Sequence, residues 1–208
     1  MSKVLFIKAN NRPAEQAVSV KLYEEFLNAY RTSHPEDEIT ELDLFAAELP
    51  YYDHSILTAL YKEANGLELT AEEAKLAALV GGYFTQFADS DKVVFGFPLW
   101  NMTVPAVLHT YMDYLAQAGK SFKYTENGPV GLLTGKKAVL LNARGGVYSE
   151  GPAAAAEMAV NYVRGNLKLF GFTDIHEIII EGHNQMPQQA AEIIGKGLEN
   201  AREAALTF

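Results

Sequence analysis

The chain of 208 residues contains no cysteine, only one tryptophan and no long apolar run. The absence of cysteine excludes disulfide bonds, thiolate metal sites and a cysteine nucleophile. No stretch approaches the roughly 18 apolar residues that a membrane-spanning helix needs. The first ten residues hold too short an apolar run for a secretory signal peptide. We therefore expect a cytoplasmic globular protein with no membrane partner.

Basic residues are also few. The chain has 17 Lys and Arg against 26 Asp and Glu, which gives a formal net charge of -9. Such a protein lacks the basic surface that attracts nucleic acid, so we expect no nucleic-acid partner. An anionic ligand must instead be attracted locally, by backbone amides and the positive end of a helix dipole.

The sequence does contain a regular alternation of short apolar runs and longer amphipathic stretches. The runs have the length of buried strands, and the stretches between them repeat their apolar residues with helical spacing. This pattern predicts one α/β domain over residues 1–208, with a mostly parallel sheet covered by helices on both faces. The expected strands cover residues 3–9, 38–44, 93–97, 138–142 and 176–182, and the expected helices residues 14–31, 71–89, 105–118, 153–170 and 187–205.

Two stretches fall outside this pattern. Residues 51–69 are polar and contain three tyrosines, which indicates loops or a short helix. Residues 121–135 are rich in turn-forming residues and show no helical period.

The predicted sheet also predicts where a ligand binds. In a doubly wound sheet of order 2-1-3-4-5, ligands bind beyond the carboxyl ends of the strands, where the winding reverses between strands one and three. The connections after the first, third and fourth expected strands are rich in Asn, Gly, Pro and aromatic residues. The unusual loops and the expected crevice therefore coincide.

The first of these loops, residues 9–19, leads into the first helix. If that helix begins near Val18, as we prefer, its unpaired amides can bind a phosphate group. Ser19 can cap the helix or donate its hydroxyl group to a phosphate oxygen. The alternative is an ordinary strand-to-helix connection, and the loop lacks the G-x-G-x-x-G fingerprint of dinucleotide sites.

The other two loops have features that suit a planar ligand. Residues 97–103 hold Trp100 and Met102, which can form apolar walls, beside Asn101, which can contact a polar edge. Residues 142–148 contain two adjacent glycines, which let a flat ring approach the backbone closely. The alternatives are a tryptophan that caps the core and a plain Gly-Gly turn.

Other chemistries find no support in the sequence. The five histidines have no metal-ligand spacing, and no G-x-S-x-G nucleophile motif is present. Residues 131–137 resemble a phosphate-binding P-loop, but they lack its final Ser or Thr and precede a strand where a P-loop follows one. We expect no metal site.

Several short segments of the sequence, taken together, are characteristic of one protein family. They are SKVLFIKA at 2–9, PLWNM at 98–102, FKYTENGP at 122–129 with Gly131 and TGKK at 134–137, and ARGG at 143–146. Together they resemble the FMN-dependent NADH-azoreductases of the flavodoxin-like NAD(P)H–quinone reductase group, which were once labelled acyl carrier protein phosphodiesterases. The resemblance covers essentially the whole chain, and the segment 122–129 is its most specific part.

The resemblance implies a flavodoxin-like fold with FMN lying across the carboxyl ends of the first, third and fourth strands. It also implies a homodimer with its sites at the interface, and a ping-pong reaction in which NADH reduces FMN and a quinone or an aromatic azo compound reoxidises it. The implied FMN-binding residues are Asn10, Ala17, Val18, Ser19, Pro98, Leu99, Trp100, Asn101, Met102, Ala143, Arg144, Gly145, Gly146 and Tyr148. The implied acceptor-pocket residues are Trp100, Phe122, Tyr124 and Phe172, with core packing as the alternative for Phe172.

The chain departs from the family pattern at the phosphate loop, where relatives usually have hydroxyl side chains and this chain has Asn10, Ala17 and Val18. Ser19 and backbone amides are then left to bind the phosphate. Because FMN performs the redox chemistry, no obligatory catalytic side chain is implied. Two alternative functions are an electron carrier without NADH turnover and a hydrolase. For a hydrolase, the sequence offers neither metal ligands nor a nucleophile and base.

Overall fold

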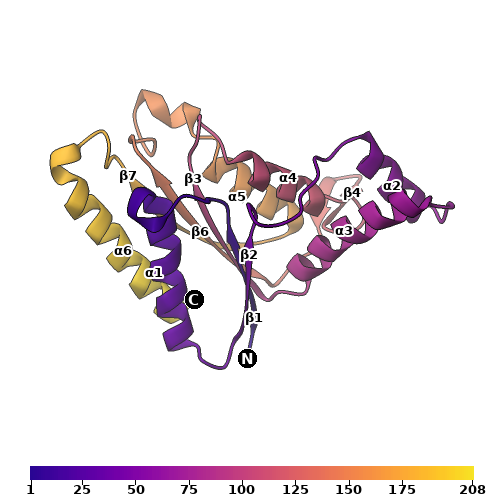
Figure 1. Cartoon of the computed structure of the whole chain (residues 1–208), viewed down its shortest axis with the longest axis horizontal. Helices are drawn as coiled ribbons and strands as arrows, with labels where there is room; N and C mark the ends of the chain where they lie inside the picture. Colours follow the sequence, from indigo (N-terminus) through magenta and orange to yellow (C-terminus); the bar gives the residue numbers. More distant parts are fainter.

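The computed structural model describes all 208 residues, and its centre is a parallel sheet of five strands (Figure 1). The strand order is β2-β1-β3-β6-β7, which is the predicted order 2-1-3-4-5. β2 and β7 therefore form the two edges of the sheet. The strands are β1 (Lys3–Lys8), β2 (Glu38–Asp43), β3 (Lys92–Pro98), β6 (Lys137–Arg144) and β7 (Asp174–Glu181).

Helices cover both faces of this sheet, as predicted. α1 (Val18–Ser33) and α6 (Ala190–Thr207) lie side by side on one face. The opposite face carries α3 (Ala71–Ala88), α4 (Ala106–Leu115) and α5 (Val160–Phe170), and α2 (His54–Ala64) packs against α3. None of the helices is both long and apolar enough to cross a membrane.

The buried strands divide their side chains between two cores, because successive residues of a strand point to opposite faces. In β1, Val4 and Phe6 pack under α1 and α6, whereas Leu5 and Ile7 belong to the core on the other side. This arrangement buries the strand on both faces, which explains its continuous apolar sequence.

Three helices begin later than their sequence periods alone suggest. One of them, α6, begins at Ala190 and not near residue 187, because Pro187–Gln189 form a 3-10 turn. α1 begins at Val18, as preferred, after a 3-10 turn over Ala14–Gln16. α5 begins at Val160 and not near residue 153, because Pro152–Ala156 form a separate 3-10 turn. The Glu157 carboxylate accepts hydrogen bonds from the N–H groups of Ala159, Val160 and Asn161, which starts α5 there.

The turn-rich stretch 121–135 contains a β-hairpin that the sequence pattern did not predict. β4 (Phe122–Thr125) pairs antiparallel with β5 (Gly128–Gly131). The hairpin packs closely against the end of α5, since a Cβ atom on Gly131 would lie 2.2 Å from the backbone nitrogen of Gly171. A glycine at this position therefore lets two backbone segments touch.

Candidate active site

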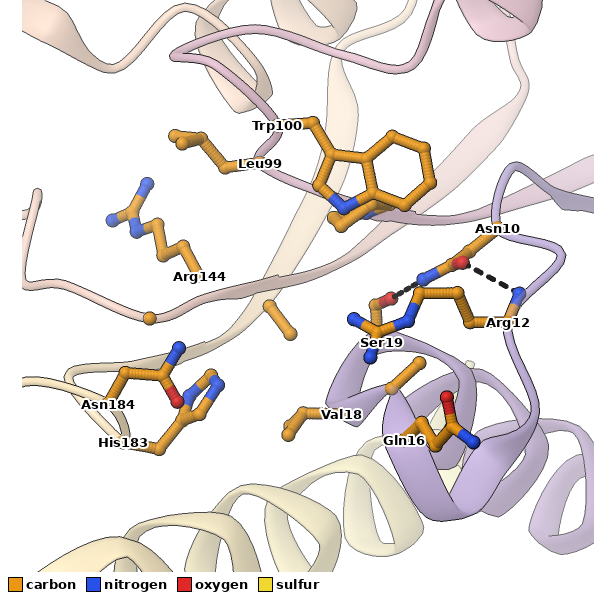
Figure 2. A pocket seen from close by; sticks show the side chains of 14 residues that line it. Asn10, Arg12, Gln16, Val18, Ser19, Leu99, Trp100, Arg144, His183 and Asn184 are labelled. Atoms are coloured by element: carbon orange, nitrogen blue, oxygen red, sulfur yellow. Dashed lines mark hydrogen bonds between the residues drawn. The ribbon is translucent and has the colours of Figure 1, made fainter. Parts of the chain in front are cut away.

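A cleft of about 400 Å³ opens at the carboxyl ends of β1, β3 and β6 (Figure 2). It brings together the three loops that the sequence singled out. Its lining consists of Asn10, Arg12, Gln16, Ala17, Val18, Ser19, Pro98, Leu99, Trp100, Ala143, Arg144, Gly145, His183 and Asn184.

A second hollow of about 480 Å³ continues from this cleft and shares Leu99, Gly145 and Asn184 with it. Its other lining residues are Asn101, Met102, Gly146, Tyr148 and Gln185. Every residue that the sequence analysis named for cofactor binding thus lines one of two adjoining hollows.

At one end of the cleft lies the N-terminus of α1. The N–H groups of Val18 and Ser19 precede the first hydrogen bonds of the helix, and no side chain caps them. The N–H group of Ala17 is already used, since it donates to Ala14 O at 3.3 Å. Two free amides and the positive end of the helix dipole therefore face an incoming anion.

Asn10 shapes this end of the cleft. Its Nδ2 donates to Ser19 Oγ at 2.9 Å, and its Oδ1 accepts from the backbone N–H of Arg12 at 3.0 Å. Both ends of the buried amide are therefore occupied by protein groups. Asn10 fixes the loop, and the Ser19 hydroxyl remains able to donate to a ligand.

Arg12 is a site residue that the sequence analysis did not assign. It lines the cleft beside the α1 N-terminus (Figure 2). Its guanidinium makes no ion pair with any carboxylate. In a protein with a net charge of -9, an unpaired cation in such a place favours an anionic ligand. The sequence signal was a lone arginine between a strand and a helix N-terminus.

The Trp100 loop is a tight turn. Trp100 N–H donates to Thr103 O at 2.9 Å and Thr103 N–H donates to Trp100 O at 3.1 Å, while Asn101 and Met102 have φ values of 49° and 72°. This is the backbone of a type I′ turn, which favours Asn and Gly. Met102 in the left-handed region is strained, and such strain often occurs at functional sites.

Trp100 forms part of the cleft wall, and its ring meets the ring of Phe45 edge-on, with centroids 6.3 Å apart. The neighbouring Met102 side chain is 47% exposed. The loop therefore presents apolar groups at the mouth of the cleft instead of burying them.

The Gly145-Gly146 turn offers hydrogen-bond donors. Gly145 O accepts from the N–H groups of Asn184 and Gln185, and Gly146 O accepts from Gly182 N–H, but neither glycine N–H has a partner. A Cβ atom on Gly145 would lie 2.4 Å from Asn184 Nδ2. The turn thus has fixed carbonyl groups, free N–H groups and no room for a side chain.

The residues after β7 form a fourth loop, which the sequence analysis also missed. His183, Asn184 and Gln185 line the hollows and are tied to the glycine turn. Burial lowers the pKa of His183, and its Nδ1 atom is buried without a hydrogen-bond partner. The available signal was a glycine at the end of the last strand followed by three polar residues.

The proposed acceptor-pocket residues other than Trp100 lie outside both hollows of this chain. Phe172 is 2% exposed and packs against Phe87, so the structure favours the core alternative for this residue. Phe122 is buried at the base of the β4–β5 hairpin. Tyr124, on the same hairpin, is 76% exposed, with its ring 5.4 Å from that of Phe122.

A doubly wound parallel sheet with a helix N-terminus, an aromatic loop and a glycine turn at its winding reversal defines an α/β protein of the flavodoxin-like class. The family model described as "Flavodoxin-like fold" matches residues 2–205, and the chain belongs to this family.

Individual relatives resemble the chain over its whole length. It is 62% identical to an "FMN-dependent NADH:quinone oxidoreductase" of Brevibacillus brevis, covering 100% of both chains. Among solved structures, an azoreductase of Bacillus anthracis str. Sterne has 60% identity and a TM-score of 0.97, again over 100% of both chains. A second Bacillus anthracis protein, an FMN-dependent NADH-azoreductase in complex with FMN, has 29% identity and a TM-score of 0.90, covering 99% of this chain and 98% of that one.

Proposed function

We propose that this chain is an FMN-dependent oxidoreductase that uses NADH to reduce quinones and to cleave aromatic azo compounds. The observation that carries the proposal is the cleft, where two free helix amides, apolar walls and a glycine turn meet at one edge of the sheet. The names of the full-length relatives, at 60% identity or more, agree with it.

The residues of the cleft fit FMN. Val18 and Ser19 N–H groups and the Arg12 guanidinium suit its phosphate. Trp100 and Leu99 suit its flat ring, and the free N–H groups of the Gly145-Gly146 turn suit the polar edge of that ring. The site thus has donors and positive charge at one end and apolar surface at the other, as FMN requires.

Bound FMN would supply the redox chemistry, accepting a hydride from NADH and passing two electrons to a quinone, or four in two rounds to an azo bond. The protein binds and orients the reactants. The N–H groups of Gly145 and Gly146 share peptide planes with the carbonyl groups of Arg144 and Gly145. Both carbonyl groups accept hydrogen bonds from the loop after β7, so the two N–H groups are held in place and can stabilise negative charge without rearranging. We assign no side chain as a nucleophile or an obligatory catalytic residue.

The test is a visible absorbance spectrum of the protein after FMN is added and the excess removed, followed by NADH without oxygen. We expect flavin bands that remain with the protein and bleach when NADH is added. Retained bands that do not bleach would contradict NADH turnover and favour an electron carrier. A protein that retains no flavin would contradict the FMN site.

We further propose that the chain acts as a cytoplasmic homodimer, in which Phe122 and Tyr124 of one copy help to enclose the acceptor at the site of the other. Support comes from the exposure of Tyr124 and from the fact that it lines neither hollow of its own chain. Sedimentation equilibrium should give twice the chain mass. In addition, Tyr124→Ala should raise the KM for the acceptor while the Kd for FMN is unchanged; a monomer, or an unchanged KM, would contradict the arrangement.

A further inference from the structure

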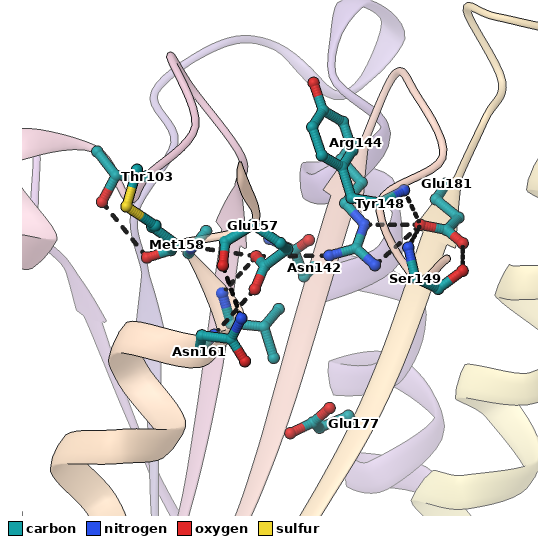
Figure 3. Close-up of polar contacts among 12 residues, drawn as sticks. Thr103, Asn142, Arg144, Tyr148, Ser149, Glu157, Met158, Asn161, Glu177 and Glu181 are labelled. Atoms are coloured by element: carbon teal, nitrogen blue, oxygen red, sulfur yellow. Dashed lines mark hydrogen bonds and ion pairs between the residues drawn. The ribbon is translucent and has the colours of Figure 1, made fainter. Parts of the chain in front are cut away.

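Arg144 ends β6 directly beneath the cleft, but its guanidinium does not point to solvent. The side chain is 3% exposed and lies between two carboxylates (Figure 3). Arg144 Nη2 is 2.8 Å from Glu181 Oε2, and Arg144 Nη1 is 3.4 Å from Glu157 Oε1. We call these three side chains the Arg144 network.

One arm of the network holds the loop Gly145–Ser149, which contains the Gly145-Gly146 turn. Glu181 Oε2 accepts from Arg144 Nε at 2.9 Å and from the backbone N–H groups of Tyr148 at 2.9 Å and Ser149 at 3.1 Å. The Ser149 hydroxyl donates to the other carboxylate oxygen. Burial raises the pKa of Glu181, but these hydrogen bonds and the Arg144 charge outweigh burial and keep the pKa below its ordinary value. The carboxylate therefore stays charged and keeps its four donors.

The other arm reaches the Trp100 loop. Glu157 caps α5, and the next residue, Met158, donates its N–H to Met102 O at 2.9 Å. Thr103 Oγ1 also lies within 3.5 Å of Met158 O and donates to it. These two hydrogen bonds to Met158, the residue next to Glu157, therefore fix the position of the Trp100 turn.

We propose that the Arg144 network is a positioning device that couples the two loops on either side of the cleft, so that the Trp100 loop and the Gly145–Ser149 loop hold their places together. The inference rests on the proposed function for its purpose, but the coupling is a property of the chain itself. A single arginine suits this role, because its planar fork can pair with two carboxylates at once.

The network also excludes a simpler role for the side chain. An Arg144 guanidinium that turned into the cleft to bind an anion would leave the buried Glu157 carboxylate without a cation and would remove the Arg144 hydrogen bond of Glu181, which costs free energy. The cleft therefore uses the backbone of Arg144, and its free cation is Arg12.

The single tryptophan of the chain allows a direct test without ligand. Of the two loops, Glu181 contacts only Gly145–Ser149, so Glu181→Gln should affect Trp100 only if the network couples the loops. We expect acrylamide to quench the fluorescence of Glu181→Gln at least twofold more strongly than that of the unsubstituted protein. Lys137→Gln is the matched control, because Lys137 pairs with Asp174 at 3.9 Å between the same two strands, β6 and β7, but at the end of these strands away from the two loops.

Unchanged quenching in a folded Glu181→Gln protein would overturn the proposal, as would an equal increase in Lys137→Gln. If Glu181→Gln does not fold, Arg144→Lys replaces it, since an ammonium keeps the charge but cannot pair with both carboxylates through a fork. Its quenching should rise in the same way, and an unchanged value would again overturn the coupling.

A second measurement connects the network to the flavin. A double-mutant cycle compares the Kd for FMN of four proteins: the parent, Glu157→Gln, Glu181→Gln and the double variant. Coupled loops predict that each single variant binds FMN about tenfold more weakly and that the double variant loses little more. Losses that multiply would contradict the coupling, whereas a parent protein that binds no FMN would contradict the proposed function and leave the fluorescence result standing.

Discussion

At the scale of single residues, the cleft depends on one free charge and on one missing side chain. Arg12 is the free charge. A charge-assisted hydrogen bond typically contributes about 1.5–3 kcal/mol. Because the chain is acidic overall, little else in the protein attracts a phosphate group over distance.

We predict that Arg12→Ala weakens FMN binding at least tenfold, which corresponds to about 1.4 kcal/mol. Riboflavin has the same ring but no phosphate, so its affinity should not change. Titration of flavin fluorescence gives both dissociation constants. An equal loss for the two ligands would mean that Arg12 supports the fold of the loop and does not bind the phosphate.

The missing side chain is at Gly145. We predict that Gly145→Ala weakens FMN binding roughly tenfold, because the new methyl group pushes the Asn184 side chain from its place 2.4 Å away. Adding Asn184→Ala should restore part of the affinity. Gly146→Ala is the control, since its nearest neighbour is 3.1 Å away in the Tyr148 ring, and it should have the smaller effect. The reverse order would contradict this account of the turn.

At the scale of elements, the Trp100 turn stores strain where it meets the cleft. Met102 has a φ of 72°, which glycine adopts freely and methionine does not. We predict that Met102→Gly raises the free energy of unfolding by about 1 kcal/mol. Urea unfolding followed by circular dichroism measures it. Asn101→Gly should gain less, because asparagine tolerates this region better; a less stable Met102→Gly protein would contradict the strain.

The elements that could be predicted from the sequence are those with a long local pattern. The five strands and the helices behind them have continuous apolar runs or repeats, and the loops of the site follow from where those strands end. The β4–β5 hairpin could not be predicted in this way. Its strands are four residues long and contain two glycines and a proline, and they are held by packing against α5.

Tertiary contacts also explain why the sequence pattern did not predict some residues of the site. His183 and Asn184 reach the cleft only because β7 pairs with β6 and its following loop bonds to the glycine turn. Arg144 was expected at the cofactor through its place in the motif, but a motif does not reveal that Glu157 and Glu181 lie beside it. These contacts join residues distant in the sequence.

At the scale of the whole molecule, a partly buried carboxylate ties several segments together at the end of the sheet opposite the cleft. Asp37 accepts hydrogen bonds from Ser2 N–H at 2.6 Å and Tyr30 Oη at 2.7 Å, and Lys92 Nζ lies 3.5 Å away. Burial raises the pKa of Asp37, but these partners outweigh burial and lower it to about 2, from an ordinary value of 3.8.

Because the pKa is lower in the folded chain than in the unfolded chain, Asp37 stabilises the fold above about pH 4, and this contribution is lost as the pH falls from about 4 to 2. We predict that the difference in unfolding free energy between the parent protein and Asp37→Asn shrinks as the pH is lowered from 5 to 3. Urea unfolding at several pH values measures it. A difference that does not change with pH would contradict the role of this carboxylate.

The two edges of the sheet have a consequence for behaviour at high concentration. An open edge strand presents unpaired backbone groups that a second chain can extend into a fibril. Here β2 carries Glu38, Glu41 and Asp43, and β7 carries Asp174 and Glu177. An incoming copy would have to desolvate charged side chains at either edge, both these carboxylates and the Lys and Arg side chains paired with them, so the two edges oppose fibrillar aggregation.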